Sequence, residues 1–331
     1  MSRPRLRALV LAAGRGERLR PLTATLPKPL LPVAGRPLVA WTLERLRDAG
    51  CEAVAINLHH LGDRIRDTLG ASFRGLPIVY SEERELLGTG GAIPPLLDFF
   101  AGADLALVVN GDSLCRWPVE ALVEKHRKSG AAATVLVERT IDPRPFGGGA
   151  ALEGDLLLAF RPGSLGYAAA RRHAVFAGAQ VIDPALFARL PEGPSDLVDA
   201  LYHPLLAEGA TIRAVETARL WHDLGTPKRY LEGVLDWAFR GSTKASRRIA
   251  GAMVDPSAEL RRTLVETGAR VHAGVRLSGS LLLPGAVCGE GARLRRALVG
   301  PGAVVPPGTQ DADALFALGA DGATQRFALA R

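Results

Sequence analysis

A loop rich in glycine and arginine near the N-terminus has the composition of a phosphate-binding site. Residues 11–18 lie at the end of an apolar stretch, residues 8–13, that predicts a buried strand. Glycines let a backbone approach an anion closely and turn its N–H groups toward it. A dinucleotide-binding loop would need a third glycine where Leu19 stands, and an ATPase loop would need Gly-Lys-Ser/Thr. The loop is therefore predicted to hold phosphate in a different way.

A lysine between two prolines follows this loop. Only five of the 41 basic residues are lysines, and Lys28 is flanked by Pro27 and Pro29. Proline restricts the backbone on each side, so the side chain starts from a rigid base. A solvated surface lysine is the alternative. We expect Lys28 to neutralise charge on a phosphate-bearing small molecule.

Two aspartates that stand 111 positions apart each follow a short apolar segment. Asp112 ends the run Asn110-Gly111-Asp112, and Asp223 lies in Trp221-His222-Asp223-Leu224-Gly225-Thr226. Carboxylates are hard oxygen ligands suited to Mg²⁺, which accepts one or two of them together with water and substrate phosphates. Either aspartate alone could instead be a turn or helix-cap residue. Together with the lysine loop, they predict a Mg²⁺ cofactor, provided that the fold brings them together.

The elements that must position these residues alternate between strand and helix. Strands are expected at 8–13, 53–57, 77–80, 105–109, 134–138, 156–160, 174–182 and 212–216, and helices at 38–49, 61–69, 90–100, 119–129, 194–208 and 231–239. This order predicts an α/β fold with a mostly parallel, doubly wound sheet. Ligands bind such sheets beyond the carboxyl ends of the strands, where the glycine-rich loop and Asp112 are expected.

The sequence changes character after a Gly/Ser-containing segment at 241–251, which is expected to be a linker. Runs beginning at Leu264, Leu281 and Leu298 resemble one another at a period of 17 residues, and aliphatic residues recur about every six residues within each run. This pattern predicts a β-helix with three short strands per coil, and an irregular Gly/Ala-rich tail is the alternative. The expected domains are residues 1–240, the linker 241–251, and the β-helix and tail at 252–331.

Five motifs together resemble the sugar-1-phosphate nucleotidylyltransferases, also called nucleotide-sugar pyrophosphorylases. They match that family in order and spacing over residues 8–240. The six-residue repeat is similar to the left-handed β-helix that many members carry at the C-terminus. The motifs are Gly14-x-Gly16-x-Arg18-Leu19, Pro27-Lys28-Pro29, Leu87-Gly88-Thr89-Gly90-Gly91-Ala92, Asn110-Gly111-Asp112 and Trp221-x-Asp223-x-Gly225-Thr226.

The resemblance implies roles for individual residues. Arg18 and Lys28 would hold the β- and γ-phosphates of a nucleoside triphosphate, while a sugar-phosphate oxygen attacks in line without a covalent enzyme intermediate. Asp112 would act in catalysis and, with Asp223, would hold Mg²⁺. The expected nucleotide contacts are Leu11, Ala12, Ala13, Gly14, Arg15, Gly16, Glu83, Gly88 and Thr89, and the expected sugar-phosphate contacts are Asn110, Gly147, Arg161 and Gly178.

Glu83 bears on the choice of base. Relatives that bind uracil or thymine often have glutamine at this position, five residues before the first glycine of the Leu-Gly-Thr motif. A carboxylate only accepts hydrogen bonds, and guanine offers two adjacent donors, N1–H and the exocyclic amine. The hypothesis is therefore a preference for GTP, and a surface glutamate in a Glu-rich stretch is the alternative.

One motif departs from the family. Many members carry Glu-Lys-Pro after a strand in the middle of the domain, with the lysine on the sugar phosphate, whereas this chain has Phe160-Arg161-Pro162. Arg161 could replace the lysine as a bidentate phosphate donor. The missing acid removes a sugar-hydroxyl contact, which leaves the sugar open.

These observations favour transfer of a nucleotidyl group from GTP to mannose-1-phosphate, with release of pyrophosphate. A UTP-dependent enzyme for an N-acetylated amino-sugar phosphate and a non-catalytic regulator that binds nucleotide-sugars are the alternatives. Acyl transfer by the β-helix is disfavoured because His272 is the only histidine beyond the linker. The neighbours His59 and His60 are not expected to form a metal pair, because adjacent side chains diverge.

Composition limits the partners. The net charge of +7 comes from 41 basic residues interspersed with 34 acidic ones, and aromatics make up only 5% of the chain, so nucleic acid is not expected. The apolar runs are shorter than the ~20 residues that span a bilayer, so no membrane segment is expected. Three widely spaced cysteines and the absence of a cleavage-like site favour a cytoplasmic protein. The β-helix could also mediate homo-oligomerisation.

Overall fold

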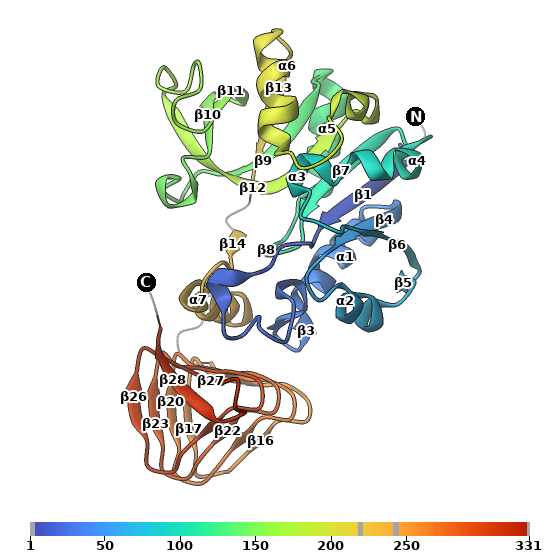
Figure 1. The fold of residues 1–331 in the computed structure, drawn as a ribbon. Helices are drawn as coiled ribbons and strands as arrows, with labels where there is room; N and C mark the ends of the chain where they lie inside the picture. The colour runs from blue at the N-terminus through green and yellow to red at the C-terminus, as the bar shows by residue number, and fades with distance from the viewer. Residues whose placement is uncertain (1–3, 218–220, 241–244, 330–331) are drawn as a thin grey trace. The chain divides into compact units, whose positions relative to one another are not determined.

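The computed structural model describes residues 4–217, 221–240 and 245–329 (Figure 1). The chain forms two compact units. The first contains residues 1–14 and 39–221, and the second contains residues 15–38 and 222–331. The loop that carries Arg18 and Lys28 therefore folds in the same unit as Asp223 and the β-helix. Among the described residues, no helix has the length and apolar character required to cross a bilayer.

A ten-stranded sheet forms the centre of the first unit. The order of its strands is β10-β11-β13-β9-β12-β7-β1-β4-β6-β5. Neighbours are parallel from β7 through β1 and β4 to β6, and again between β9 and β13, whereas β12 is antiparallel to both β7 and β9. The strands are β1 Leu6–Leu11, β4 Cys51–Leu58, β5 Ser72–Phe73, β6 Leu76–Glu82, β7 Leu105–Asn110, β9 Ala133–Glu138, β10 Ala150–Glu153, β11 Leu156–Phe160, β12 Arg172–Ile182 and β13 Ile212–Glu216.

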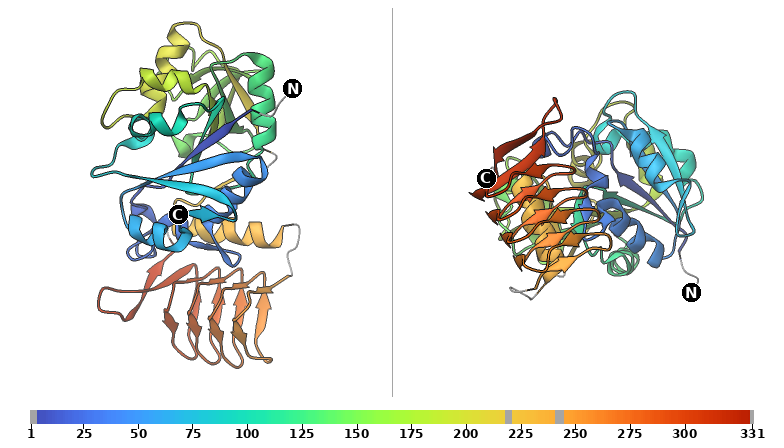
Figure 2. Two further views of the ribbon diagram at one scale, coloured as in Figure 1. Left: turned by 90° about the vertical axis from the view of Figure 1, so that its right-hand side faces the viewer. Right: turned by 90° about the horizontal axis from the view of Figure 1, so that it is seen from below.

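Helices lie on both faces of this sheet, as Figure 2 shows. Both faces of the central strands are consequently buried, so β1 and β7 consist of nearly continuous apolar residues rather than alternating ones. The helices of this unit are α1 Leu38–Asp48, α2 Gly62–Leu69, α3 Gly88–Gly91, α4 Leu97–Phe100, α5 Val119–Ser129 and α6 His203–Ala207. The short strand β8 Ser113–Cys115 also belongs to this unit, and the short strand β14 Trp221–Asp223 begins at its last residue. The predicted doubly wound α/β sheet is confirmed.

Two of the expected helices are interrupted. The segment expected as one helix at 90–100 contains α3, a 3-10 turn at Pro94–Leu96 and α4, because proline lacks the N–H that a continuous helix needs. The segment expected as a helix at 194–208 contains a π-helical turn, Val198–Tyr202, followed by α6. The sequence analysis also did not predict strand β10, which follows three successive glycines, residues 147–149.

A β-helix occupies most of the second unit, in agreement with the predicted repeat. Leu264 pairs in parallel with Leu281, and Leu281 with Leu298, so each coil takes 17 residues. Figure 2 shows the coils stacked along one axis. The strands are β15 Arg247–Arg248, β16 Met253–Val254, β17 Glu259–Arg261, β18 Leu264–Val265, β19 Arg270–Val271, β20 Arg276–Ser278, β21 Leu281–Leu282, β22 Val287–Cys288, β23 Arg293–Arg295, β24 Leu298–Val299, β25 Val304–Val305, β26 Gln310–Ala312, β27 Ala314–Leu318 and β28 Thr324–Ala328.

The ends of the β-helix differ from the expectation. The expected linker 241–251 includes 241–244, which lie outside the described residues, and β15, which pairs in parallel with β18 and so belongs to the first coil. At the other end, β28 turns back and pairs antiparallel with β27. This hairpin covers the exposed edge of the last coil, which an open row of strands would otherwise offer to another chain.

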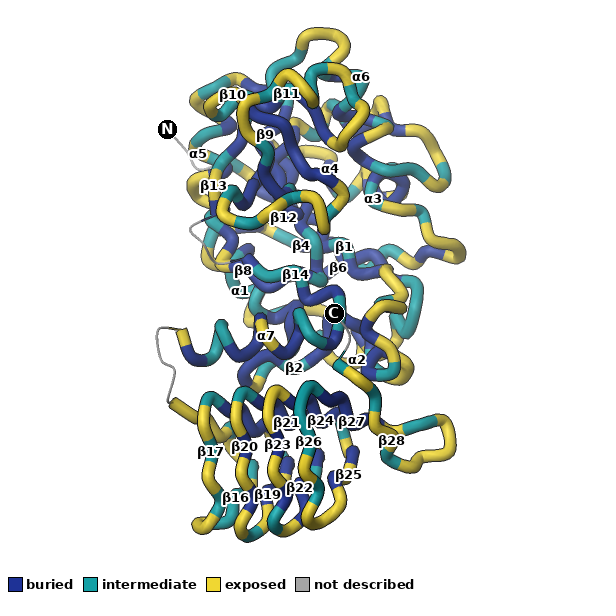
Figure 3. The backbone as a smooth tube through the Cα atoms, turned by 90° about the vertical axis from the view of Figure 1, so that its left-hand side faces the viewer, coloured by how far each residue is buried: buried dark blue, intermediate teal, exposed yellow. Residues whose placement is uncertain are grey.

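In one of the three β-helix sheets, the strands between the two edge strands are buried on both faces. In the sheet that contains β18, β21, β24 and β27, Val265, Leu282, Val299 and Phe316 belong to the interior cluster. The alternate residues, Leu264, Leu281, Leu298 and Leu315, point away from that interior and are nevertheless no more than 1% exposed. Figure 3 shows these strands in the buried colour, unlike the strands of the other two sheets.

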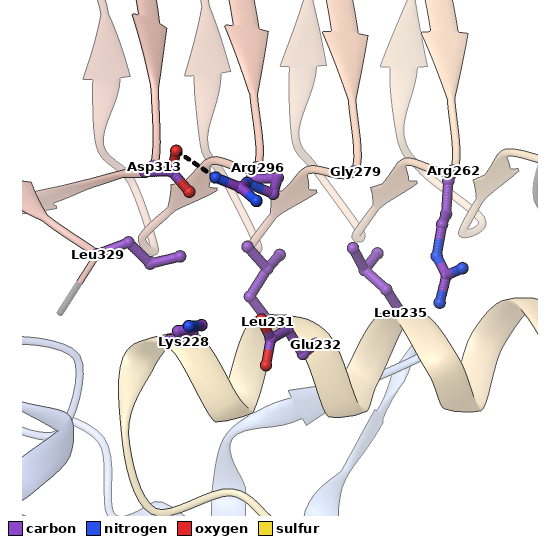
Figure 4. Close-up of a pocket in the computed structure, with 9 residues that line it drawn as sticks. All are labelled: Lys228, Leu231, Glu232, Leu235, Arg262, Gly279, Arg296, Asp313 and Leu329. Atoms are coloured by element: carbon purple, nitrogen blue, oxygen red, sulfur yellow. Dashed lines mark hydrogen bonds and ion pairs between the residues drawn. The ribbon is translucent and has the colours of Figure 1, made fainter. Parts of the chain in front are cut away.

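Helix α7, Pro227–Phe239, presents leucines to these coils. Figure 4 shows Leu231 and Leu235 directed from α7 toward the β-helix, beside Arg262 and Arg296. These residues line a pocket of about 640 Å³. The Arg296 guanidinium forms an ion pair with Asp313, with 2.5 Å between Nη2 and Oδ2. Helix α7 and the β-helix therefore line one pocket of mixed apolar and charged character within the same unit.

Two adjacent valines in β25 test which side chains of the β-helix point into its interior and which point to solvent. We expect Val305→Ala, at a position that is fully buried, to lower the free energy of unfolding by about 2 kcal/mol, because two buried carbons are lost and a cavity remains. Val304 is 48% exposed, and Val304→Ala should change stability by less than about 0.5 kcal/mol. Chemical denaturation measures both, and equal effects would contradict the assignment.

Candidate active site

A buried lysine, an aspartate and an arginine lie together in the second unit. Lys28 is only 5% exposed, and its Nζ lies 3.9 Å from Oδ1 of Asp223. Oδ2 of the same carboxylate accepts a hydrogen bond from Arg229 Nη1 at 2.6 Å. The solvated-lysine alternative for Lys28 is therefore excluded. Two cations contact one partly buried carboxylate, and cationic side chains held in this way can attract an anionic ligand.

The chain around Asp223 fixes this carboxylate. Thr226 caps α7 by accepting a hydrogen bond from the Arg229 N–H at 3.3 Å, and Pro227 occupies the first helical turn. The cap places Arg229 so that it reaches back to Asp223. A methyl group added at Gly225 would lie 2.9 Å from both Asp223 carboxylate oxygens and 2.9 Å from Arg18 Nη2. Arg18 and Asp223 therefore lie against the same glycine, and Arg18 remains exposed to solvent.

The glycine-rich loop is open where a phosphate would approach. Gly14 and Arg15 are exposed, Gly16 and Leu11 are partly buried, and Ala12 and Ala13 are buried at the end of β1. No atom outside the neighbouring residues lies within 4 Å of a methyl group added at Gly14. The Thr23 hydroxyl donates to the Gly16 carbonyl at 2.8 Å and closes the loop on the side of Lys28.

Glu83 is a buried acceptor at the end of β6 rather than a surface glutamate. It is 6% exposed. Oε1 accepts a hydrogen bond from Asn57 Nδ2 at 2.7 Å, and Oε2 accepts one from the Leu87 N–H at 3.0 Å. Asn57 Oδ1 in turn accepts from the Ala12 N–H at 2.7 Å. Glu83 thus connects the loop after β1 to the Leu-Gly-Thr motif through one hydrogen-bonded chain.

The glycines of that motif allow another backbone segment to approach. A methyl group at Gly88 would lie 2.5 Å from the Ser195 carbonyl oxygen, and one at Gly91 would lie 2.2 Å from the Gly193 carbonyl oxygen. Both distances are far shorter than a carbon–oxygen contact permits. Within the motif, the Thr89 hydroxyl accepts from the Leu197 N–H at 2.9 Å. The motif therefore packs closely against residues 193–197, and Gly88 and Thr89 remain only partly covered.

Asn110, the last residue of β7, lies beside Gly178, which stands inside β12. Gly178 has φ +81° and stands in an irregularity of the β12–β9 pairing, and a methyl group there would lie 2.5 Å from Asn110 Nδ2. Asp112 follows Asn110 in the same unit, and Ser113 Oγ lies 3.5 Å from its Oδ1. Two of the predicted sugar-phosphate residues and one predicted metal ligand therefore share one end of β7.

Arg161 and Gly147 line an open pocket of about 790 Å³ in the first unit, together with Tyr167 and His173. The Arg161 guanidinium is engaged by two carboxylates, Nη2 with Asp196 Oδ1 at 2.8 Å and Nη1 with Asp199 Oδ2 at 2.9 Å. Both pairs are partly exposed. A phosphate in this pocket would compete with these aspartates for Arg161.

The chemistry of the donors fits Mg²⁺. Asp112 and Asp223 supply carboxylate oxygens, and Asp223 is held from both sides by cations rather than by other acids. No group of three or more His, Cys, Asp or Glu side chains suited to a metal occurs in the part of the chain that the structure describes. Mg²⁺ needs no such group, because it commonly uses one or two carboxylates with water and substrate phosphates.

The cysteines are unsuited to nucleophilic catalysis. Cys51, Cys115 and Cys288 are all free and buried. Burial raises the pKa of the Cys51 and Cys288 thiols to about 12, so little thiolate forms at neutral pH. A covalent thioester or thiophosphate route therefore has no support at these positions.

Comparison with known proteins identifies the family. The sequence pattern described as nucleotidyl transferase matches residues 7–153, and the pattern described as the GlmU-like C-terminal hexapeptide matches residues 236–313. A mannose-1-phosphate guanylyltransferase of Mycobacterium tuberculosis is 34% identical over 81% of this chain and 77% of its own length. The chain belongs to the sugar-1-phosphate nucleotidylyltransferase family. It is a nucleotidyltransferase with a left-handed β-helix, as the motifs and the repeat predicted.

Eukaryotic members of the family are also similar to this chain. The catalytic subunit beta of mannose-1-phosphate guanylyltransferase from Drosophila pseudoobscura pseudoobscura is 28% identical over 77% of this chain and 70% of its own length. The corresponding Danio rerio protein is 27% identical over 76% of this chain and 72% of its own length.

The sequence analysis of this nucleotidyltransferase missed three residues of the site. Asn57 is the polar end of an otherwise apolar strand, and that contrast could have marked it. Arg229 stands six residues after Asp223 and three after the Thr226 cap, a spacing that could have suggested its contact. Asp196 had no local signal, because its bond to Arg161 crosses 35 residues.

Glu83 and its neighbour Glu85 provide a matched test of the buried network. Glu83→Ala should lower the free energy of unfolding by about 3 kcal/mol, because the Asn57 amide and the Leu87 N–H both lose their acceptor. Glu85 is exposed, and Glu85→Ala should change stability by less than about 0.5 kcal/mol. Thermal and urea denaturation of both variants check this, and equal stability would show that Glu83 is not a structural acceptor.

Proposed function

We propose that this nucleotidyltransferase transfers GMP from GTP to mannose-1-phosphate, giving GDP-mannose and pyrophosphate. The fixed positions of Lys28 and Arg229 on Asp223 carry the proposal, because cationic side chains in the segment and unit that follow a glycine-rich loop suit a triphosphate. The names of the relatives from Mycobacterium and Drosophila support the sugar and the base.

The reaction is an in-line displacement at phosphorus. An oxygen of the sugar phosphate attacks the α-phosphorus of GTP, a new P–O bond forms, and the bond from the α-phosphorus to the bridging oxygen breaks, so that pyrophosphate leaves. Lys28 and Arg18 stabilise the charge that builds on the leaving pyrophosphate. The backbone of residues 11–16 holds the phosphates while these side chains neutralise them.

Asp112 and Asp223 hold Mg²⁺ in this proposal. When bound, the ion neutralises phosphate charge and orients the α-phosphate toward the attacking oxygen. Arg229 and Lys28 hold the Asp223 carboxylate in a fixed direction. The approach of Asp112 to Asp223 is part of the proposal.

Glu83 is placed at the guanine base, with Gly88 and Thr89 beside it. A carboxylate has about four lone-pair positions, and the structure shows two of them accepting from Asn57 and Leu87. The remaining two can accept from N1–H and the exocyclic amine of guanine.

The sugar phosphate is placed beside Asn110, Gly178, Gly147 and Arg161. The contact of Asn110 with Gly178 and the pocket that Gly147 and Arg161 line support this placement. We place the reaction in the cytoplasm, where a reducing environment would keep the three buried cysteines as thiols. We place any contact between copies of this chain on the β-helix face that carries Met253, which is 50% exposed, and Val304.

The substrates can be tested with four nucleoside triphosphates against mannose-1-phosphate and N-acetylglucosamine-1-phosphate. We expect GTP with mannose-1-phosphate to give the highest kcat/KM for pyrophosphate release. Reactions with excess EDTA or with Asp112→Asn should release almost none and serve as blanks. A wild-type preference for UTP would overturn the guanine assignment, and no pyrophosphate with any pair would overturn the enzymatic proposal.

Lys28 can be tested against another lysine of the chain. Lys28→Ala should lower kcat/KM at least about 30-fold, since a lost charge contact in the transition state costs about 2 kcal/mol or more. Lys128 is exposed and pairs with Glu124, so Lys128→Ala is the matched control and should stay within about twofold. A Lys28→Ala enzyme within about threefold of wild type would contradict the phosphate-positioning role.

A further inference from the structure

One row of the β-helix faces the segment that carries Arg18 and Lys28. The residues of this row each follow a strand of the sheet that is buried on both faces, at intervals of 17 residues. Glu266 is 1% exposed and Leu283 is fully buried, although both lie at the outside of their coils. The row consists of Ile249, Glu266, Leu283 and Gly300.

The segment 15–38 meets this row at two places. Glu266 Oε1 accepts a hydrogen bond from the Gly35 N–H at 3.1 Å, and a methyl group at Gly35 would lie 2.9 Å from Ile249 Cγ2. At the other end, a methyl group at Gly300 would lie 3.2 Å from Leu22 Cδ2. The catalytic segment is therefore in contact with the β-helix both before and after Lys28.

Glu266 holds a strained turn. Ala34 has φ +52° and Gly35 has φ +86°, and these two residues join β2 Pro32–Val33 to β3 Arg36–Pro37. Two successive residues in this conformation suit a two-residue hairpin, but alanine adopts it only at a cost. The backbones of both Gly35 and Ala34 hydrogen-bond the Glu266 carboxyl, which compensates for that cost.

The turn is connected to Lys28 through the backbone. The Leu38 N–H donates to the Leu31 carbonyl at 2.9 Å, and the Leu31 N–H donates to the Lys28 carbonyl at 3.0 Å. The hydroxyl of Tyr230, on α7, donates to the Pro32 carbonyl at 2.5 Å. A displacement of the turn would therefore move the short helical turn Lys28–Leu30, and the Lys28 ammonium with it.

We propose that Glu266 is a positioning residue for catalysis, which clamps the Ala34–Gly35 turn to the β-helix and thereby sets the place of Lys28. The proposal rests on the proposed function, in which Lys28 neutralises the triphosphate. Errors of about 1 Å in the place of such a charge lower the rate by about two orders of magnitude. In this proposal, the β-helix fixes the position of the catalytic loop.

Burying a carboxyl group at this position costs desolvation energy, which indicates that its hydrogen bonds to the turn stabilise the structure. Burial raises the pKa of Glu266 above its usual value, while hydrogen bonds from the Gly35 and Ala34 backbones and the charge of Arg247 oppose that rise. An aliphatic residue like Leu283, at the same place in the next coil, would avoid the desolvation cost. It would also leave two backbone donors without their acceptor.

The first measurement is hydrogen exchange of the full-length protein. In Glu266→Ala, peptides that cover residues 32–38 should exchange at least about tenfold faster, because the amides of the turn lose their acceptor. Glu266→Gln keeps an acceptor oxygen and should exchange more slowly than Glu266→Ala. Glu290, exposed in a later coil, gives the control Glu290→Ala, which should leave this exchange unchanged. Unchanged exchange in Glu266→Ala would overturn the clamp.

The second measurement is kinetic coupling to Lys28. Glu266→Ala should lower kcat/KM for pyrophosphate release by about tenfold or more, Glu266→Gln should recover at least about half of that loss on a logarithmic scale, and Glu290→Ala should stay within about twofold. The double variant Lys28→Ala/Glu266→Ala should be no slower than Lys28→Ala alone, because Glu266 acts through Lys28.

The outcomes separate the clamp from the proposed function. Losses that multiply in the double variant, or a normal rate in Glu266→Ala despite faster exchange, would overturn the positioning role while the proposed function stands. A normal rate in Lys28→Ala itself would overturn the role of Lys28, and the positioning role of Glu266 would fall with it. A general loss of stability would lower the melting temperature without producing non-additivity at Lys28.

Discussion

The buried charge of Lys28 is the constraint on which the site depends. An ammonium that is 5% exposed requires a partner, and one partner, Asp223, also binds Arg229 at a much shorter distance. In the proposed function, the phosphates of the nucleotide lie beside these cations, and their charge favours an arrangement that is costly without ligand.

The division of the chain into two units explains why these charged side chains lie together. Segment 15–38 leaves the sheet immediately after β1 and joins the unit formed by α7 and the β-helix. Arg18, Lys28, Asp223 and Arg229 consequently belong to one compact body. The groups expected to read the base and the sugar, such as Glu83 and Asn110, are instead fixed at the ends of strands β6 and β7.

Local pattern predicted some elements well and others poorly, for physical reasons. Helix α5 begins and ends at the expected residues, because Gly130 adopts the left-handed conformation and terminates it. The β-helix strands recur at the expected interval of 17 residues, because each coil must repeat its inward-pointing aliphatic residues. Proline interrupted the helix expected at 90–100, although the signal stood in the sequence.

The partners of site residues were the least predictable. The bond between Asn57 and Glu83 depends on the register in which β4 pairs with β6, and the bond between Glu266 and Gly35 spans 231 residues. No local pattern encodes either contact. The sequence predicts Gly88 as a nucleotide contact, and the structure shows in addition a packing requirement that spacing alone did not suggest, since a methyl group at Gly88 would lie 2.5 Å from the Ser195 carbonyl oxygen.

The 17-residue repeat has a consequence for how such a protein can change length. Leu22 lies against Gly300 and the Gly35 turn against Glu266, two coils apart, which corresponds to about 9–10 Å along the stack. Duplication or loss of a coil between these two would shift one anchor by a whole strand spacing and pull the loop out of place. Coils added after Gly300 would leave both anchors where they are, so the C-terminal end of this β-helix is free of this constraint.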